Sequence, residues 1–395
     1  MNYLKFLSLT LLSLALSFCA YKETPPNAEQ LLEKAEMQLN HLLEEAEKAN
    51  DIPRTLTALR EIHWINKGFD WTEGFFPGSC WYLYEHTGDE KWKKAAEKFQ
   101  APYESHKYNI DNHDLGFIFN CSYGNGYRIT QNPSFKEVMV TAADSLITRF
   151  NPQVGCIQSW NADKGWQAKR GWKFPVIVDN MMNLELLFEV SQLTKDPKYA
   201  NIAIAHANTT LQHHFRPDHS SYHVVDYDPE TGEVRSKETA QGYAHESSWA
   251  RGQAWGLYGF TLCYRYTQKP EYLKIAEDIA SFYLQHENLP ADLIPYWDFN
   301  APNIPEEPQD VSAAAIVVSA LIELDGFSST SYRPVIDKIL SSLASETYTA
   351  TIGENQGFIL DHSVGSIPHG AEIDVPLNYA DYYYIEALIR YKNQF

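Results

Sequence analysis

The chain has 395 residues, of which 44% are hydrophobic and 21% are charged, a balance that excludes extended disorder, collagen-like repeats and a multi-pass membrane protein. Its 51 acidic residues outnumber its 32 basic ones, for a net charge of −19, and no run of lysine and arginine offers a basic face to nucleic acid. The length allows two or three domains or one large closed domain. A chain this acidic must meet any anionic ligand with a local basic group.

The N-terminus has the pattern of an export signal. Lys5 supplies a positive charge ahead of the apolar residues 6–18, a stretch too short to span a bilayer as a helix. It leads to Cys19 in a sequence that resembles a lipoprotein box, although Phe18 is bulky where a small residue is usual, so simple secretion is the alternative. We predict a signal peptide over residues 1–19 with Cys19 as its lipidation site, followed by a linker over 20–34.

These features predict a location. The protein is expected to be exported to the periplasm, or anchored to the outer membrane by its lipid, in a bacterium of the Gram-negative type. The lipid anchor would be its sole contact with a membrane, and we expect a monomer or a weak dimer.

Neither the remaining cysteines nor a group of histidines forms a recognisable metal motif. No CxxC or HExxH spacing occurs, and no acid completes a ligand set beside the histidines. The residues considered are Cys80, Cys121, Cys156, Cys263, His213, His214, His219 and His223. We predict no metal and no cofactor, and interpret the cysteines as small buried hydrophobes, with one disulfide left open.

Helical hairpins dominate the rest of the chain. Residues 28–50 have apolar positions at helical spacing among Glu and Lys. Beyond them one turn recurs four times, at residues 87–92, 130–135, 194–199 and 267–272, each with Thr first and an aromatic residue last. Apolar helical patterns lie on both sides, and Asp, Asn and Pro at the turns end one helix and begin the next. Strand-like alternation is confined to short pieces such as 221–227.

A chain of helical hairpins with long loops predicts an all-α fold. We expect a closed double ring of helices, an (α/α) barrel, with the loops gathered at one end, as a single domain over residues 35–395. An open helical-repeat scaffold is the structural alternative.

Two acids stand where a polar run meets an apolar one, before predicted helices. Asp114 lies in the stretch 109–117 and Asp179 in 175–184. Each is interpreted either as a helix N-cap or as a catalytic acid. Apolar surroundings would raise the pKa of Asp179, as a general acid working near neutral pH requires.

Aromatic residues are dense near two other segments. Trp71 and Phe75 are interpreted either as rings that stack on a sugar or as a core pair at a helix entry. In the stretch 239–256, Arg251 lies between Trp249 and Trp255, an arrangement that suits a carboxylate held by a planar guanidinium. A buried Arg251 paired with Glu246 is the alternative.

At these residues the sequence resembles the unsaturated glucuronyl hydrolases of glycoside hydrolase family 88. The matching strings run in the family's order over residues 35–393. They are His113-Asp114-Leu115-Gly116-Phe117, Asp179-Asn180-Met181-Met182-Asn183, Thr239-Ala240-Gln241-Gly242-Tyr243, Ser248-Trp249-Ala250-Arg251-Gly252-Gln253-Ala254-Trp255-Gly256, and residues 374–383 around Tyr379. The resemblance implies an (α/α)6 barrel, which agrees with the hairpins read from the repeated turns.

The resemblance also implies a reaction. A glycosidase of this family releases the non-reducing-end Δ4,5-unsaturated glucuronic acid from glycosaminoglycan-type oligosaccharides made by lyases, by hydrating the C4=C5 double bond. Asp179 would donate the proton to C4 and then accept one from the water that adds at C5. Asp114 would hold ring hydroxyls and stabilise the cation. The remaining substrate-binding residues implied are Trp71, Phe75, His113, His223, Thr239, Gln241, Trp249, Arg251, Trp255 and Tyr379.

Substrate choice and two rival functions stay open. The loop 363–370, where the next sugar and any sulfate would be bound, carries Ser and His but no Lys or Arg. The rivals are an unsaturated rhamnogalacturonyl hydrolase or another (α/α)6 sugar enzyme, and a non-catalytic helical lipoprotein that binds oligosaccharides. A binding protein would not need both Asp114 and Asp179.

Overall fold

The computed structural model describes residues 25–65 and 68–395. The predicted signal peptide and the lipidation site Cys19 lie outside this range and stay predictions. The predicted linker over 20–34 is wrong in its second half, because helix α1 (Ala28–Ala49) begins seven residues before the expected start of the domain and buries Ala28 and Leu32. Asn27 caps this helix by accepting a hydrogen bond from the backbone N–H of Gln30.

The described residues are mostly helical, as the sequence predicts. In chain order, after α1, the helices are α2 (Phe75–Thr87), α3 (Glu90–Gln100), α4 (Leu115–Phe119), α5 (Asn125–Thr130), α6 (Pro133–Ile147), α7 (Asn180–Thr194), α8 (Pro197–His213), α9 (Ala250–Thr267), α10 (Pro270–Gln285), α11 (Val311–Asp325), α12 (Arg333–Leu343) and α13 (Asn378–Gln394). A single π-helical turn, Asn120–Gly124, joins α4 to α5. Three 3-10 segments, Ala101–Tyr108, Gln167–Lys169 and Asn355–Gly357, lie in the loops.

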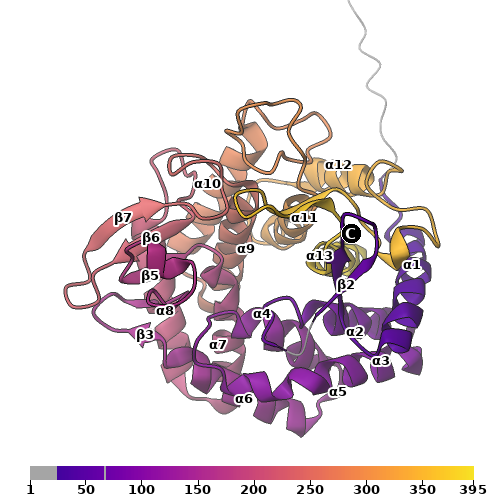
Figure 1. Ribbon diagram of the computed structural model, residues 1–395, viewed down its shortest axis with the longest axis horizontal. Helices are drawn as coiled ribbons and strands as arrows, with labels where there is room; N and C mark the ends of the chain where they lie inside the picture. Colours follow the sequence, from indigo (N-terminus) through magenta and orange to yellow (C-terminus); the bar gives the residue numbers. More distant parts are fainter. Residues whose placement is uncertain (1–24, 66–67) are drawn as a thin grey trace, which may run out of the picture.

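The helices surround a common centre in two layers (Figure 1). In the inner layer each helix contacts the next, from α4 through α7, α9, α11 and α13 to α2, and α2 contacts the π-helical turn that continues α4. In the outer layer α3, α6, α8, α10 and α12 each pack against the inner helix before them, and α1 packs against α13. The first and the last helix of the fold are therefore neighbours.

All four predicted hairpin turns are present, and one geometry explains them. In the turn after α7, the hydroxyl of Thr194 donates to the carbonyl of Val190 and accepts from the backbone N–H of Asp196. Lys195 adopts a left-handed conformation with φ of 61°, and Asp196 caps α8, whose first residue is Pro197. The equivalent Thr87, Thr130 and Thr267 make the same pair of hydrogen bonds. The aromatic residues that end the motif, Trp92, Phe135, Tyr199 and Tyr272, are buried.

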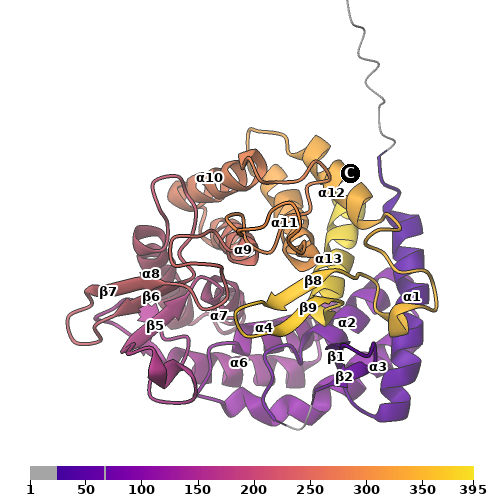
Figure 2. The same cartoon turned by 45° about the horizontal axis from the view of Figure 1, so that its top comes forward.

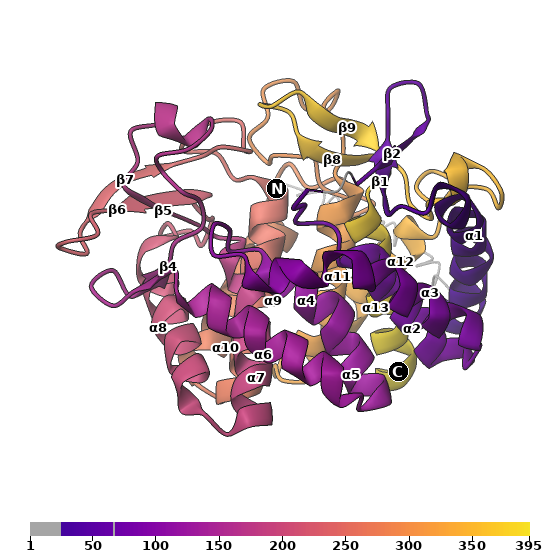
Figure 3. The ribbon, with the colours of Figure 1, turned by 60° about the horizontal axis from the view of Figure 1, so that its bottom comes forward.

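Short antiparallel strands occupy the loops at the other end of the helices (Figures 2 and 3). They pair as β1–β2, β3–β4, β5–β6–β7 and β8–β9. Their bounds are β1 (Pro53–Leu56), β2 (Ile62–Trp64), β3 (Phe150–Asn151), β4 (Cys156–Ile157), β5 (Phe174–Ile177), β6 (Val224–Tyr227), β7 (Val234–Glu238), β8 (Ser363–Ser366) and β9 (Ala371–Val375). Of the predicted alternation over 221–227, only 224–227 is strand.

The cysteines of the described region behave as predicted. Cys80, Cys121, Cys156 and Cys263 are all buried and free, so no disulfide joins them. Over the same residues, none of the helices combines the length and the apolar character that crossing a membrane requires.

Candidate active site

Two acidic side chains stand at the N-terminal ends of inner helices without capping them. Asp114 holds the N-cap position of α4 and Asp179 that of α7, and neither carboxylate makes a capping hydrogen bond. Asp310, by contrast, holds the N-cap position of α11 and accepts from the backbone N–H of Ser312. The N-cap interpretation of Asp114 and Asp179 is therefore wrong for their side chains, which are left available for chemistry.

A close approach of two helices brings these acids to the same place. A Cβ atom on Gly116 would lie 2.4 Å from the Cα of Asn183, so only glycine allows α4 to pack this tightly against α7. The backbone N–H of Phe117 then donates to the side-chain oxygen of Asn183 at 3.0 Å. Asp179 is placed from the other side, since Val178 continues β5 and its N–H donates to the carbonyl of His223.

Burial raises the pKa of both carboxyl groups, and the charge of Asp179 adds to the effect on Asp114. Each residue is only 8% exposed. Loss of water, followed by the charge of Asp179, raises the pKa of Asp114 to about 8. Loss of water also raises the pKa of Asp179 to about 7, against the opposing charge of Arg251. Below neutral pH both carboxyl groups therefore keep their protons in the folded protein.

Each acid faces a neutral histidine whose tautomer the backbone fixes. Nδ1 of His223 accepts from the backbone N–H groups of Ala240 and Gln241, at 3.1 and 3.2 Å. Its Nε2 must therefore carry the proton, and it lies 3.7 Å from Oδ2 of Asp179. Burial holds the pKa of His223 well below its usual value, so the ring stays neutral. An N–H rather than a cation thus points at Asp179.

His113 repeats this arrangement beside Asp114. The oxygen of the Asn183 amide accepts from a backbone N–H, so the NH2 group of Asn183 faces Nδ1 of His113, at 3.3 Å. Nε2 of His113 lies 3.3 Å from Oδ1 of Asp114. Burial lowers the pKa of His113 to about 3. Both acids are therefore approached by a neutral donor.

Arg251 is buried and its charge is compensated. Its guanidinium donates to Oδ2 of Asp310 at 2.9 Å and to the backbone carbonyls of Val364 and Gly365. Pairing with Glu246 is wrong, because Glu246 is exposed and contacts Arg216 instead. Arg251 ties α9 to β8 and lowers the pKa of Asp179.

The predicted sugar-stacking rings differ in exposure. Trp71 is half-buried and meets Phe75 edge to face at 5.7 Å. Phe75 is fully buried, so its predicted direct stacking on a sugar is wrong, and Trp255 is fully buried as well. The polar contribution of Trp255 lowers the pKa of Asp179 slightly against the effect of burial. Tyr379 is 1% exposed and its ring lies 5.6 Å from the Arg251 guanidinium.

The other predicted binding residues do gather around His223. The ring of Trp249 lies 4.6 Å from that of His223. Thr239 accepts from the N–H of Gly242 at 2.8 Å, which shapes the turn that carries Gln241. The amide of Gln241 reaches the carbonyl of Gly365 at 3.4 Å and so bridges to β8.

The loop 160–172, in which no site residue was predicted, also reaches the site. Trp160 lies edge to face with His223 at 5.9 Å and continues to Trp166 and Trp172. These three tryptophans recur at intervals of six residues, a signal that was readable in the sequence. Asp310 had no such signal, since it reads as an ordinary N-cap before an apolar helix.

Metal-binding geometry is not found in the part of the chain that the structure describes, where no three His, Cys, Asp or Glu side chains are grouped to hold an ion. The histidines considered above separate: His213 ends α8, whereas His223 faces Asp179.

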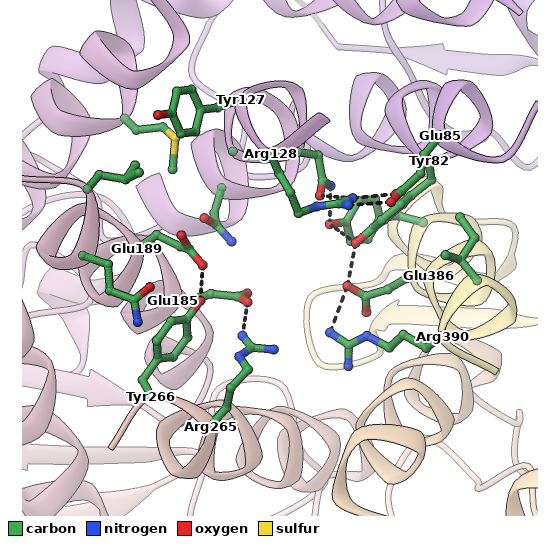
Figure 4. A pocket seen from close by; sticks show the side chains of 18 of the residues that line it. Tyr82, Glu85, Tyr127, Arg128, Glu185, Glu189, Arg265, Tyr266, Glu386 and Arg390 are labelled. Atoms are coloured by element: carbon green, nitrogen blue, oxygen red, sulfur yellow. Dashed lines mark hydrogen bonds and ion pairs between the residues drawn. The ribbon is translucent and has the colours of Figure 1, made fainter. Parts of the chain in front are cut away.

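The opposite end of the inner helices holds a cavity of about 700 Å³ (Figure 4). Charged side chains from α2, α5, α7, α9 and α13 line it, and they are joined in pairs. Arg128 binds Glu85 through two hydrogen bonds, Arg265 contacts Glu185, and Arg390 contacts Glu386.

Comparison with known proteins agrees with this geometry. The model of Glycosyl Hydrolase Family 88 matches residues 48–393. An unsaturated glucuronyl hydrolase of Formosa agariphila is 47% identical over 87% of this chain and 86% of its own. A crystal structure of an unsaturated glucuronyl hydrolase specific for heparin is 42% identical, with a TM-score of 0.87, over 93% of this chain and 98% of the other.

A variant of the Streptococcus agalactiae unsaturated glucuronyl hydrolase, crystallised with dGlcA-GalNAc6S, is also similar. It is 30% identical, with a TM-score of 0.78, over 94% of this chain and 93% of the other. The matched residues 48–393 include helices α2 to α12, nearly all of α13 and both buried acids. The chain therefore belongs to glycoside hydrolase family 88, the family of the unsaturated glucuronyl hydrolases.

Proposed function

We propose that this enzyme removes a Δ4,5-unsaturated glucuronic acid from the non-reducing end of oligosaccharides that lyases cut from glycosaminoglycan-type chains. The observation that carries the proposal is the pair of buried, uncapped acids, Asp114 and Asp179, both with raised pKa. A protein that only bound sugars would gain nothing from such a pair, because an unpaired buried carboxyl group destabilises the fold.

The chemistry follows from the substrate's enol ether. Protonated Asp179 donates its proton to C4, and positive charge develops at C5 and the ring oxygen. Water adds at C5 and returns a proton to Asp179, which regenerates the acid. The resulting hemiketal opens to a ketone, and the bond from C1 to the remaining sugar breaks. One water molecule is consumed, and a proton is neither gained nor lost by the enzyme.

The neighbours of the acids suit these roles. The N–H of His223 faces Asp179, and it can hold the carboxylate that forms after proton transfer. Below neutral pH both acids are protonated, so Asp179 can donate its proton while Asp114 holds ring hydroxyls by hydrogen bonds, and Nε2 of His113 lies beside it. Because both histidines are neutral, neither competes with Asp179 as the acid.

The substrate's carboxylate meets a favourable field although Arg251 is paired. Helices α4, α7, α9 and α11 all begin around the site, at N-cap positions Asp114, Asp179, Trp249 and Asp310. The N-terminal end of a helix carries partial positive charge. These converging ends supply the local attraction for an anion that an acidic chain needs.

We further propose that the two helical layers form an (α/α)6 barrel. In support, six inner positions contact one another in sequence and the last meets the first, and each has an outer partner. The bound sugar in the Streptococcus agalactiae relative, dGlcA-GalNAc6S, supports a glucuronyl–hexosamine disaccharide as the minimal substrate. A heparin specificity is described for another relative.

The test follows the loss of ultraviolet absorbance of the conjugated double bond. Wild type, Asp179→Asn and Asp114→Asn are each given an unsaturated chondroitin disaccharide and its saturated counterpart. We expect wild type to consume only the unsaturated sugar, and Asp179→Asn to lose the activity by at least about 10³-fold while remaining folded. Turnover of the saturated sugar, which has no such absorbance and is followed by the reducing ends released, would indicate an ordinary glycosidase instead. An unreactive, folded wild type would point to a binding protein.

A further inference from the structure

A line of aromatic rings leads from the catalytic acid to the surface. It starts at His223, which faces Asp179, and continues through Trp160 and Trp166 to His369. The centroids of successive rings are 5.9, 5.1 and 5.1 Å apart. This step is similar to the advance of a sugar chain per residue, so the rings can follow successive sugars.

The outer part of this line is exposed although it is apolar. Trp166 is 36% exposed, whereas Trp172 beneath it is 5% exposed. A tryptophan held at the surface beside other rings, instead of being turned into them, is typical of a binding surface. Trp166 lies in the loop 160–172 and His369 in the turn between β8 and β9, so the contact between them spans two segments far apart in the chain.

The loop that carries Trp166 is anchored on both sides. On one side Asn161 donates to Asp111 at 2.8 Å and accepts from Arg149 at 3.1 Å. On the other, Arg170 donates to the carbonyl of Thr239 at 3.1 Å. A ring fixed in this way can bind a sugar without first being ordered, which reduces the entropic cost of binding.

Arg170 supplies the basic group that the loop 363–370 lacks. Its guanidinium lies 5.8 Å from the centroid of Trp166 and 5.1 Å from that of Trp172. It comes no closer than 4.0 Å to the carboxylate of Glu238, and its side chain is 32% exposed. Arg251, which is paired with Asp310 and fully buried, offers no comparable charge to a ligand.

We propose that Trp166 and Arg170 form a subsite for the third sugar of an acidic oligosaccharide. This inference rests on the proposed function. The unsaturated uronate lies at Asp179, the hexosamine lies along Trp160, and the third sugar stacks on Trp166. In an alternating glycosaminoglycan chain the third sugar is again a uronate, and its carboxylate pairs with Arg170. The enzyme therefore prefers tetrasaccharides to disaccharides.

The experiment compares kcat/KM for an unsulfated unsaturated disaccharide and the tetrasaccharide of the same repeat. For wild type we expect the tetrasaccharide to be better by about tenfold, mainly through KM. Trp166→Ala should bring this ratio close to one with little change on the disaccharide, and Trp166→Phe, which keeps a ring, should retain part of it. Arg170→Gln should lower the ratio and remove its dependence on salt.

Phe395→Ala is the matched control, because Phe395 is 44% exposed and ends α13, away from the site. It should leave the ratio unchanged. A wild-type ratio of one, or an unchanged ratio in Trp166→Ala, would overturn the subsite, as would an equal loss on both substrates. If wild type converts neither sugar, the proposed function itself fails. Disaccharide turnover without a length preference rejects only the subsite.

Discussion

The two ends of the inner helices treat charge in opposite ways. At the N-terminal ends, Asp114 and Asp179 are buried without a cation bonded to either. At the C-terminal ends, Arg265 contacts Glu185 and Glu323, and Arg390 contacts Glu323 and Glu386. Both ends are lined with ionisable groups, but only at the N-terminal ends do buried acids lack a bonded cation. The comparison separates the charges that stabilise the fold from those that the reaction requires.

The largest effect on stability is expected from breaking a pair at the C-terminal ends. Arg265→Met leaves Glu185 without its ion-pair partner in a partly buried network, while Glu323 keeps only Arg390. We expect the free energy of unfolding to fall by about 3 kcal/mol, because a buried charge without a partner is costly. Denaturant unfolding measures it, and the activity per folded molecule should stay unchanged. A loss below about 0.5 kcal/mol would show that solvent screens this network.

At the active site, removing a charged group is expected to raise the free energy of unfolding instead of lowering it. Asp179→Asn removes a carboxyl group that burial destabilises when it is charged, so above neutral pH the free energy of unfolding should rise by about 1–2 kcal/mol. The same substitution removes activity. Thermal unfolding of wild type and variant at equal pH checks this prediction. A less stable variant would mean that the carboxylate has a stabilising partner.

The two buried acids should also make the free energy of unfolding depend on pH. Folding raises the pKa of Asp114 to about 8 and of Asp179 to about 7, so between the unfolded value near ~4 and pH ~8 the folded state holds protons that the unfolded chain has released. The free energy of unfolding should therefore fall as pH rises through this window, by about 1.4 kcal/mol per pH unit for each retained proton.

Urea unfolding across that window measures the slope. A double variant, Asp114→Asn with Asp179→Asn, should flatten it. Part of the slope should remain, because burial also raises the pKa of Asp381 to about 7. An identical slope in wild type and double variant would show that the two acids are ionised normally in the folded protein.

Removing the N–H that His223 points at Asp179 is expected to lower kcat by about tenfold. An asparagine at this position can accept the backbone hydrogen bonds that Nδ1 accepts, but its side chain is too short to reach Asp179. The longer side chain of glutamine can place an NH2 group near the position of Nε2. We expect His223→Asn to lower kcat by about tenfold and His223→Gln to retain more of it. A pH–rate profile of each variant tells a changed Asp179 from a displaced substrate. Equal losses would indicate that only the shape of His223 matters.

The smallest effect is expected from ionic strength on kcat/KM. The chain carries a net charge of −19, so distant charges do not attract an anionic substrate. We expect kcat/KM for the disaccharide to be nearly flat, or to rise, as ionic strength increases. A steep fall from low to moderate salt would show a long-range basic surface at the site.

Local rules predicted the features that depend on neighbouring residues. The repeated Thr turns could be found because each needs only a Thr, a left-handed residue, a cap and a proline or polar start within six positions. Asp114 and Asp179 were found for a related reason, as acids at boundaries between polar and apolar runs. The resemblance to the family added their roles.

Features set by tertiary packing could not be found in this way. Arg251 pairs with Asp310, which is 59 residues away, whereas the sequence suggested the neighbouring Glu246. Phe75 and Trp255 are fully buried by helices that meet only in the folded protein. Trp160 and Trp166 reach the site because the bridge between Asn112 and Trp160 fixes their loop. The helical spacing over 28–50 did predict α1, and only the boundary of the domain at residue 35 was misplaced.

The pairing of α1 with α13 has a consequence for synthesis on the ribosome. Leu32, Leu39 and Leu42 form the buried face of α1, yet the helix they pack against is the last to be made. The contact has the greatest sequence separation in the fold, and such contacts form late. Much of this apolar face is therefore expected to stay uncovered until α13 has been made, and a chain cut before residue 378 is expected to aggregate there first.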